Sequence, residues 1–159
     1  MTITLVLKAD AIQSLDLSPG HAIVRQLLVE PQACAQQLQW VIDFPLAPDD
    51  PRELSEIEEI RLWFLRWDVA YPWLPYFLDW RAGELTRYAA MLVPHQFSQR
   101  EGLLFNPEAL EIFVMQKTFV LLDWLRDKPF GNTAEIGSMA QVLGYTIDRE
   151  FFELANRTS

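Results

Sequence analysis

The stretch Ile60–Phe97 reads IRLWFLRWDVAYPWLPYFLDWRAGELTRYAAMLVPHQF and holds ten aromatic residues within 38 positions. Four of the six tryptophans of the chain lie in it, at Trp63, Trp67, Trp73 and Trp80. Aromatic side chains bury large areas and carry polar tips, so a dense group of them forms either a core or a binding face. The stretch contains no histidine–cysteine cluster and no glycine-rich loop, and it is therefore more typical of a binding protein than of an enzyme.

Length and composition indicate one globular domain that spans residues 1–159. Half of the residues are hydrophobic, which is ample for a single core and far from the composition of a disordered chain. Acidic residues outnumber basic residues 22 to 13, which gives a formal net charge of −9. A phosphate backbone or an anionic lipid surface repels such a chain, so we expect neither a nucleic-acid partner nor a membrane-bound state.

The sequence also indicates a cellular compartment. Its one cysteine, Cys34, fits a reducing compartment or a small buried side chain. The N-terminal sequence MTITLVLKADAIQ has no basic segment that leads into an apolar run. No segment approaches the roughly 18 uninterrupted apolar residues that a membrane-spanning helix needs. We therefore expect a cytoplasmic protein.

The first third of the chain predicts two strands with helices between them. Thr2–Leu7 is rich in β-branched residues and predicts a strand, and Leu38–Phe44 predicts a second one. Between them, apolar residues recur at helical spacing from Ser18 to Glu30, and a short helix is expected over Pro31–Gln37. The polar residues 45–59, which include three prolines, predict a surface connection with one helical turn.

The aromatic stretch itself predicts further strands. Ile60–Val69 is apolar on both faces when it is read as a strand, which is typical of a central strand or of one covered by helices. Phe77–Trp80 and Glu84–Val93 fit the two arms of a hairpin that turns around Gly83. A helix over Glu84–Leu92 is the open alternative, because its apolar residues also fit a helical period.

Helices are expected in the last third. Asn106 is a preferred N-cap and the proline after it suits the first helical position, so a long helix is expected over Pro107–Asp127. Its apolar residues extend beyond one stripe, which indicates a helix mostly buried against a sheet. The residues that widen the stripe are Ile112, Met115, Phe119 and Leu122. Thr133 predicts the cap of a further helix that Gly144 terminates, and Asp148–Asn156 predicts a final short helix.

These elements together predict an α+β fold in a single domain. The expected architecture is an antiparallel sheet of four to five strands packed against one long C-terminal helix and several shorter helices. The helix over Pro107–Asp127 is the element expected to cover the sheet. The chain contains no internal repeat and no low-complexity tract, which agrees with one compact unit.

The sequence offers no metal or cofactor signature. His21 and His95 are isolated from each other, one cysteine cannot form a zinc site alone, and the six glycines are scattered. We therefore expect neither a metal nor a cofactor. His95 is interpreted as a loop histidine that bonds a backbone carbonyl, with a role in proton transfer as the alternative.

Charged residues interleave with the aromatic residues between Arg61 and Arg87. They form ion pairs across a hairpin or belong to a recognition surface, and the two arrangements can coexist on opposite faces of one sheet. Tryptophan, tyrosine and arginine dominate the residues that carry most of the binding energy in protein interfaces. The contact face predicted for a protein partner consists of Trp63, Arg66, Trp67, Trp73, Tyr76, Trp80, Arg87 and His95.

Four tracts of the chain, FPLAPDDPRELSEIEEIRLWFLRWD, YPWLPYFLDW, AGELTRYAAMLVPHQFS and EGLLFNPEALEIFVMQK, are long and unusual. They resemble the chlororespiratory reduction 6 family of cyanobacteria and chloroplasts, and the similarity extends from Ile3 to about Phe152. The resemblance implies a factor needed to assemble the photosynthetic NAD(P)H dehydrogenase-like complex. Such a factor would act at the hydrophilic arm, in connection with the ferredoxin-like iron–sulfur subunit. Because the chain begins at its first strand without a transit extension, we expect a cyanobacterial, cytoplasmic member.

The expected function is that of a non-catalytic assembly factor that binds an unassembled subunit. Such a factor holds an incomplete subunit through an adaptable apolar surface and performs no chemistry. The first alternative is an enzyme or small-ligand binder with a pocket lined by Asp68, Glu84, Arg87 and His95. The second alternative is a stable structural subunit of a larger complex.

Overall fold

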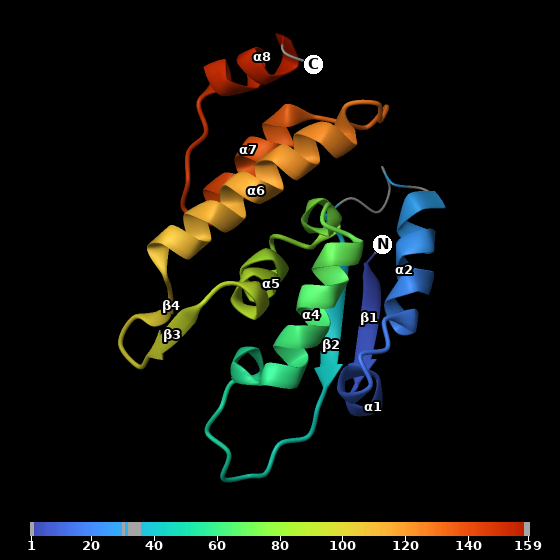
Figure 1. The fold of residues 1–159 in the computed structure, drawn as a ribbon, viewed down its shortest axis with the longest axis vertical. Helices are drawn as coiled ribbons and strands as arrows, with labels where there is room; N and C mark the ends of the chain where they lie inside the picture. Colours follow the sequence, from blue (N-terminus) through green and yellow to red (C-terminus); the bar gives the residue numbers. More distant parts are fainter. Residues whose placement is uncertain (1, 30, 32–35, 158–159) are drawn as a thin grey trace.

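The computed structural model describes residues 2–29, 31 and 36–157. Cys34 and most of the helix expected over Pro31–Gln37 lie outside these residues. Figure 1 shows a two-stranded sheet with helices beside it in one part of the molecule and two helices packed side by side in another. A final helix lies at one end of this pair, and a short hairpin lies at the opposite end.

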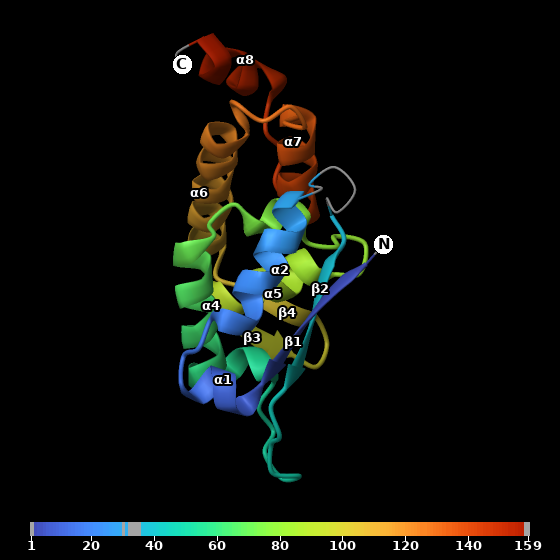
Figure 2. The same ribbon diagram turned by 90° about the vertical axis from the view of Figure 1, so that its right-hand side faces the viewer.

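The N-terminal part forms a parallel two-stranded sheet. It contains β1 (Ile3–Lys8), α1 (Ala9–Gln13), α2 (Ser18–Val29) and β2 (Leu38–Asp43), which agrees with the strands and the helix expected here. The helices carry the chain back to the start of the sheet, so β2 pairs with β1 in parallel. In this pairing Ile3 lies opposite Leu38 at one end, and Lys8 lies opposite Asp43 at the other. Alternate residues of β1 are buried, and Figure 2 shows helices gathered on one side of the sheet.

The next element is a helix, and the strand expected over Ile60–Val69 is wrong. After the 3-10 turn η1 (Leu54–Glu56), α4 covers Glu58–Ala70. Its buried residues Ile60, Trp63, Phe64 and Trp67 follow the i, i+3, i+4, i+7 spacing of one helical face. Aromatic and β-branched content suggested a strand, but the helical period of the buried residues prevails.

The hairpin expected around Gly83 is also wrong. The 3-10 helix η2 (Leu74–Phe77) precedes one isolated parallel bridge between Leu78 and Leu38, and α5 covers Glu84–Leu92. Gly83 is the N-cap of α5 and has φ of 81°, a left-handed conformation that glycine adopts without strain. The alternative of a helix over Glu84–Leu92 is thus confirmed.

The last third contains a hairpin and three helices. The antiparallel strands β3 (His95–Ser98) and β4 (Gly102–Phe105) lead into α6 (Pro107–Leu125). The expected cap is confirmed, because the Asn106 side chain accepts a hydrogen bond of 3.0 Å from the backbone N–H of Ala109. Two further helices are α7 (Thr133–Val142) and α8 (Arg149–Arg157). The cap of α7 is Asn132 instead of Thr133, since its side chain accepts from the N–H of Ala134.

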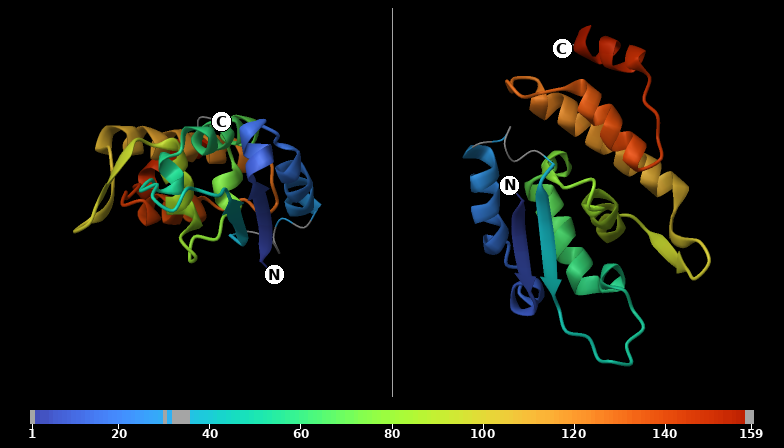
Figure 3. Two further views of the ribbon diagram at one scale, coloured as in Figure 1. Left: turned by 90° about the horizontal axis from the view of Figure 1, so that it is seen from below. Right: turned by 180° about the vertical axis from the view of Figure 1, so that it is seen from behind.

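The fold class is α+β, but the expected antiparallel sheet of four to five strands is wrong. The described residues form two separate two-stranded sheets, one parallel and one antiparallel. A helix covers most of the expected range Pro107–Asp127, yet α7 and α8 follow it, so it is not the C-terminal element. Figure 3 shows that α6 packs beside α7 instead of lying across a sheet. No described helix is both long and apolar enough to cross a membrane.

The core is centred on stacked tryptophans of α4. Trp63 and Trp67 are fully buried, with ring centroids 5.3 Å apart and planes at 15°. The indole N–H of Trp63 donates to the carbonyl of Asp16 at 2.8 Å, so its polar tip is satisfied. Trp67 lies against Gly20 of α2, where a Cβ atom would stand only 2.0 Å from Cζ3 of the indole. The close approach of α2 to α4 therefore requires glycine at position 20.

We expect Gly20→Ala to lower the free energy of unfolding by about 1–3 kcal/mol, because the added methyl group forces the Trp67 ring to move. Gly137→Ala in α7 is the matched control. A Cβ at position 137 would meet Phe152 at 3.8 Å, an ordinary contact, so the helical gain of about 0.5–1 kcal/mol should appear. Urea unfolding measures both values, and equal effects of the two substitutions would contradict the packing described here.

Candidate protein-binding surface

Three of the aromatic residues predicted to contact a partner are part of the core. Trp63, Trp67 and Tyr76 are buried. The Tyr76 hydroxyl donates to the carbonyl of Phe130 at 3.2 Å, and burial raises its pKa to about 12. In this conformation these three side chains belong to the interior and do not form part of the contact face.

The two remaining tryptophans of the predicted face are half-buried. Trp73 stacks on Trp124 of α6, with ring centroids 4.5 Å apart and planes at 10°, so it joins the residues before η2 to α6. The indole N–H of Trp80 donates to the carbonyl of Pro75 at 2.9 Å. Both residues combine a structural contact with partial exposure.

The polar members of the predicted face lie at three different places. Arg66 is exposed on α4. Arg87 is half-buried and donates to the carbonyl of Trp40 at 3.1 Å, with its guanidinium 5.9 Å from the centre of the Trp40 ring. His95 Nδ1 lies 2.9 Å from the carbonyl oxygen of Val93, which agrees with the expected bond to backbone, but His95 begins strand β3 and the expected loop position is wrong. Its Nε2 lies 3.1 Å from the hydroxyl of Ser55.

The pocket considered as an alternative is not formed by its four residues. Asp68 pairs with Lys117, and His95 with Ser55 and backbone. Glu84 is only 7% exposed, and an oxygen of its carboxylate lies 3.7 Å from Arg87. Burial raises the pKa of Glu84, while the charge of Arg87 opposes this. Glu84 and Arg87 thus lie beside each other, whereas Asp68 and His95 bond to other groups, so the four side chains do not converge as an acid–base site.

A buried charged network that the sequence did not reveal joins three helices. Lys117 of α6 is 0% exposed, and its ammonium donates to the two carboxylate oxygens of Asp68 of α4 at 2.6 and 2.7 Å. The Tyr88 hydroxyl of α5 donates to the same carboxylate at 2.6 Å. Burial lowers the pKa of Lys117, and Asp68 opposes this; burial and the Asp68 charge raise the pKa of Tyr88 well above its usual value. A lone lysine within apolar α6 was the available signal.

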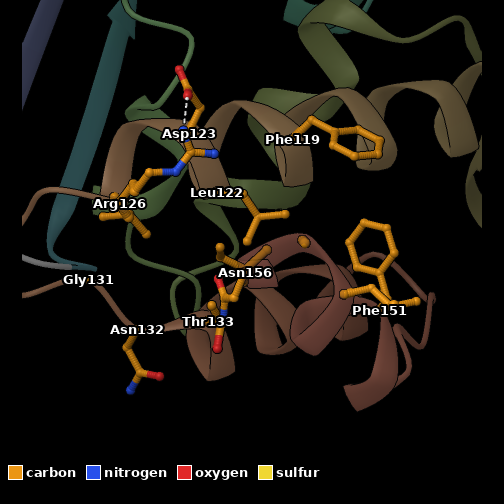
Figure 4. A pocket seen from close by; sticks show the side chains of 13 residues that line it. Phe119, Leu122, Asp123, Arg126, Gly131, Asn132, Thr133, Phe151 and Asn156 are labelled. Atoms are coloured by element: carbon orange, nitrogen blue, oxygen red, sulfur yellow. Dashed lines mark ion pairs between the residues drawn. The ribbon is translucent and has the colours of Figure 1, made fainter. Parts of the chain in front are cut away.

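A groove with a volume of about 680 Å³ lies between α6, α7 and α8. Figure 4 shows Phe119 and Leu122 of α6 on one side of it and Phe151 of α8 on the other. The rings of Phe119 and Phe151 are 5.7 Å apart in an edge-to-face arrangement. Its lining is mainly apolar, and Asp123 and Arg126 form an ion pair of 3.3 Å at its border. Such a groove suits an apolar segment better than a charged small molecule.

The groove continues an apolar stripe along the outer face of α6. Ile112 is 70% exposed and Phe119 is 54% exposed, while Met115 and Leu122 are half-buried. The composition of α6 predicted that these residues would lie against a sheet, and this prediction is wrong. The buried face of α6 instead contains Leu110, Phe113, Val114, Lys117, Thr118, Leu121 and Leu125.

These features define an acidic α+β domain with an exposed apolar helix face and groove, a combination typical of polypeptide-binding domains. The chain belongs to the chlororespiratory reduction 6 family, whose model matches residues 7–154. This finding confirms the resemblance seen in the sequence. The family is one of assembly factors, linked by its name to chlororespiratory reduction and to the NAD(P)H dehydrogenase-like complex. No solved structure matches the chain.

We expect Lys117→Met to lower the free energy of unfolding by about 3–5 kcal/mol, because it leaves the largely buried carboxylate of Asp68 without its cation. The double variant Asp68→Asn/Lys117→Met should recover a large part of this loss, since the amide oxygen still accepts from Tyr88 and no charge is buried. Urea unfolding of the two variants and the parent tests this. A loss below about 1 kcal/mol in the single variant would mean that water solvates Asp68.

The alkaline limit of stability should depend on Tyr88. Above about pH 11 lysines are deprotonated in folded and unfolded chains alike, and unfolded tyrosines are ionised. Folded Tyr88 keeps its proton because its pKa is raised, so the folded state binds more protons and stability falls as pH rises. Tyr76, with a pKa of about 12, adds to the fall. Unfolding free energies measured between pH 11 and 12 should therefore decline less steeply in Tyr88→Phe; parallel declines would contradict the raised pKa.

Proposed function

We propose that this protein is an assembly factor that binds an unassembled subunit of the hydrophilic arm of the photosynthetic NAD(P)H dehydrogenase-like complex. The observation that carries the proposal is membership of the chlororespiratory reduction 6 family over residues 7–154. We propose the ferredoxin-like iron–sulfur subunit as the client, and the cytoplasm of a cyanobacterial-type cell as the place of action. The protein acts by binding and performs no chemical step.

The exposed apolar surface supports a binding role. The stripe on α6 and its groove leave large apolar side chains at the surface, and α4 exposes Leu62, Leu65 and Val69 next to Arg66. A transient interface of standard size buries about 800 Å² on each partner. Since association costs offset much of the gain from apolar burial, such an interface is compatible with release of the client after assembly.

Five residues of the predicted contact face reach the surface and are retained as proposed contacts: Arg66, Trp73, Trp80, Arg87 and His95. The buried members, Trp63, Trp67 and Tyr76, act indirectly by fixing α4 and η2. The hydrogen bonds of His95 and the pairing of Asp68 with Lys117 favour structural roles for the groups that an enzyme would use in proton transfer.

Deletion of the gene in its photosynthetic host tests the proposal. We expect the assembled dehydrogenase-like complex, quantified on native gels, to fall at least about tenfold and to return when the gene is restored. Tagged protein expressed in cells that cannot finish the complex should retain the unassembled iron–sulfur subunit. An Arg66→Ala/Trp80→Ala variant with an unchanged melting temperature should retain less of it.

Two results would count against this function. Normal amounts of the complex in the deletion strain would show that the protein is not needed for assembly. Co-purification with the mature complex at fixed stoichiometry would instead identify a permanent structural subunit, the alternative that the sequence leaves open.

A further inference from the structure

The outer face of α6 has the spacing of a helix–helix seam. Ile112, Met115, Phe119 and Leu122 follow one another at i, i+3, i+7 and i+10, the a and d positions of a heptad pattern. The two most exposed of them, Ile112 and Phe119, lie one heptad apart. An amphipathic helix laid into an apolar groove is recognised through this kind of spacing. The face therefore suits a helix better than an extended strand or a compact ligand.

The groove beside α8 gives this face a wall at one end. Phe119 and Leu122 belong both to the stripe and to the groove, and Phe151 of α8 stands opposite Phe119 (Figure 4). Phe152 anchors α8, since it is buried and its ring lies next to Gly137 of α7. A helix that follows the stripe would thus pass from the open N-terminal half of α6 into a walled C-terminal half.

The charges around the stripe are distributed unevenly along α6. The exposed ionisable residues of α6 are Glu108, Glu111 and Asp123, and its one cation, Lys117, is buried against Asp68. Asp123 at the groove end is paired with Arg126 at 3.3 Å. Glu108 and Glu111 at the other end form no salt bridge with any residue that the structure describes. The open end of the stripe is therefore acidic, whereas the walled end is close to neutral.

We propose that the stripe and groove bind one amphipathic helix of a partner polypeptide, with apolar side chains at heptad spacing and lysine or arginine residues over Glu108 and Glu111. This inference rests on the proposed function, in which the unassembled subunit supplies the helix. A second copy of the chain fits less well, because each copy carries a net charge of −9. In addition, parallel pairing of two α6 helices would place the acidic ends together.

Binding of two synthetic peptides of opposite charge to the purified full chain tests the proposal. Both peptides are 18-residue helices with leucine at the heptad positions and glutamine elsewhere; one carries three lysines at one end, and the other carries three glutamates there. We expect the lysine peptide to bind about tenfold more tightly than the glutamate peptide by fluorescence anisotropy at low salt. The Glu108→Lys/Glu111→Lys variant should reverse this preference, provided that its melting transition shows a folded protein.

The apolar contribution is tested with the same lysine peptide. Phe119→Ala should weaken its binding about tenfold or more, because aromatic anchors carry much of the energy of an interface. Val41→Ala is the matched control, since Val41 is 51% exposed on β2, outside the groove, and its removal should leave binding unchanged.

Three results of the binding experiments would overturn the inference: no reversal of peptide preference, equal effects of Phe119→Ala and Val41→Ala, or a parent dimer in sedimentation that Phe119→Ala dissociates. The last would identify the stripe as a self-interface. Full restoration of the complex in the deletion strain by Phe119→Ala would also overturn it, while leaving the proposed function intact. Normal assembly in the deletion strain together with charge-dependent peptide binding would reject the function and retain the helix-binding site.

Discussion

At the carboxylate of Asp68, α4, α5 and α6 meet through polar bonds. It accepts from Lys117 at 2.6 and 2.7 Å and from Tyr88 at 2.6 Å. Removing a lysine from water is costly, and only a close carboxylate makes the burial tolerable. Apolar packing alone would allow α6 to rotate or slide, whereas a buried ammonium leaves few acceptable positions. The network thus favours one arrangement of the three helices.

The orientation of α6 follows from this pair. At 100° per residue, Ile112 and Phe119 fall about 140° and 160° around the helix from Lys117. Pairing of Lys117 with Asp68 therefore turns the apolar stripe outward, although the whole helix reads as core. The buried pair of Asp68 and Lys117 therefore both joins the helices and determines which face of α6 is exposed. The stacking of Trp73 on Trp124 adds a second link between α6 and the residues before η2.

The parts of the fold that depend on local chemistry could be predicted from the sequence. β1, β2 and the Asn106 cap follow from β-branched runs and from a side chain that bonds its own helix. The parallel pairing of β1 with β2 could not be predicted, because it arises from a crossover and not from either strand. α4 was misread since its aromatic content favours strand, although Trp63 and Trp67 lie one helical turn apart and stack.

The candidate site could be predicted only in part from the sequence. The aromatic stretch was correctly expected to form a core or a face, but the division between the two depends on tertiary packing, which buries Trp63 and leaves Trp80 half-buried. The outward stripe of α6 could not be found, because Asp68 and Lys117 are 49 residues apart in the chain. A buried ion pair between distant residues leaves no local pattern in the sequence.

An exposed apolar stripe is an aggregation risk that this chain offsets with charge. Copies that each carry a net charge of −9 repel one another at long range, while a partner with basic residues is attracted over the same distance. The groups that repel copies therefore also select the partner. The stripe exposes two large apolar side chains, Ile112 and Phe119, while Met115 and Leu122 are half-buried, which limits the apolar area that binding can cover. A factor that must release its client benefits from that limit, since tight burial of a larger surface would make the complex permanent.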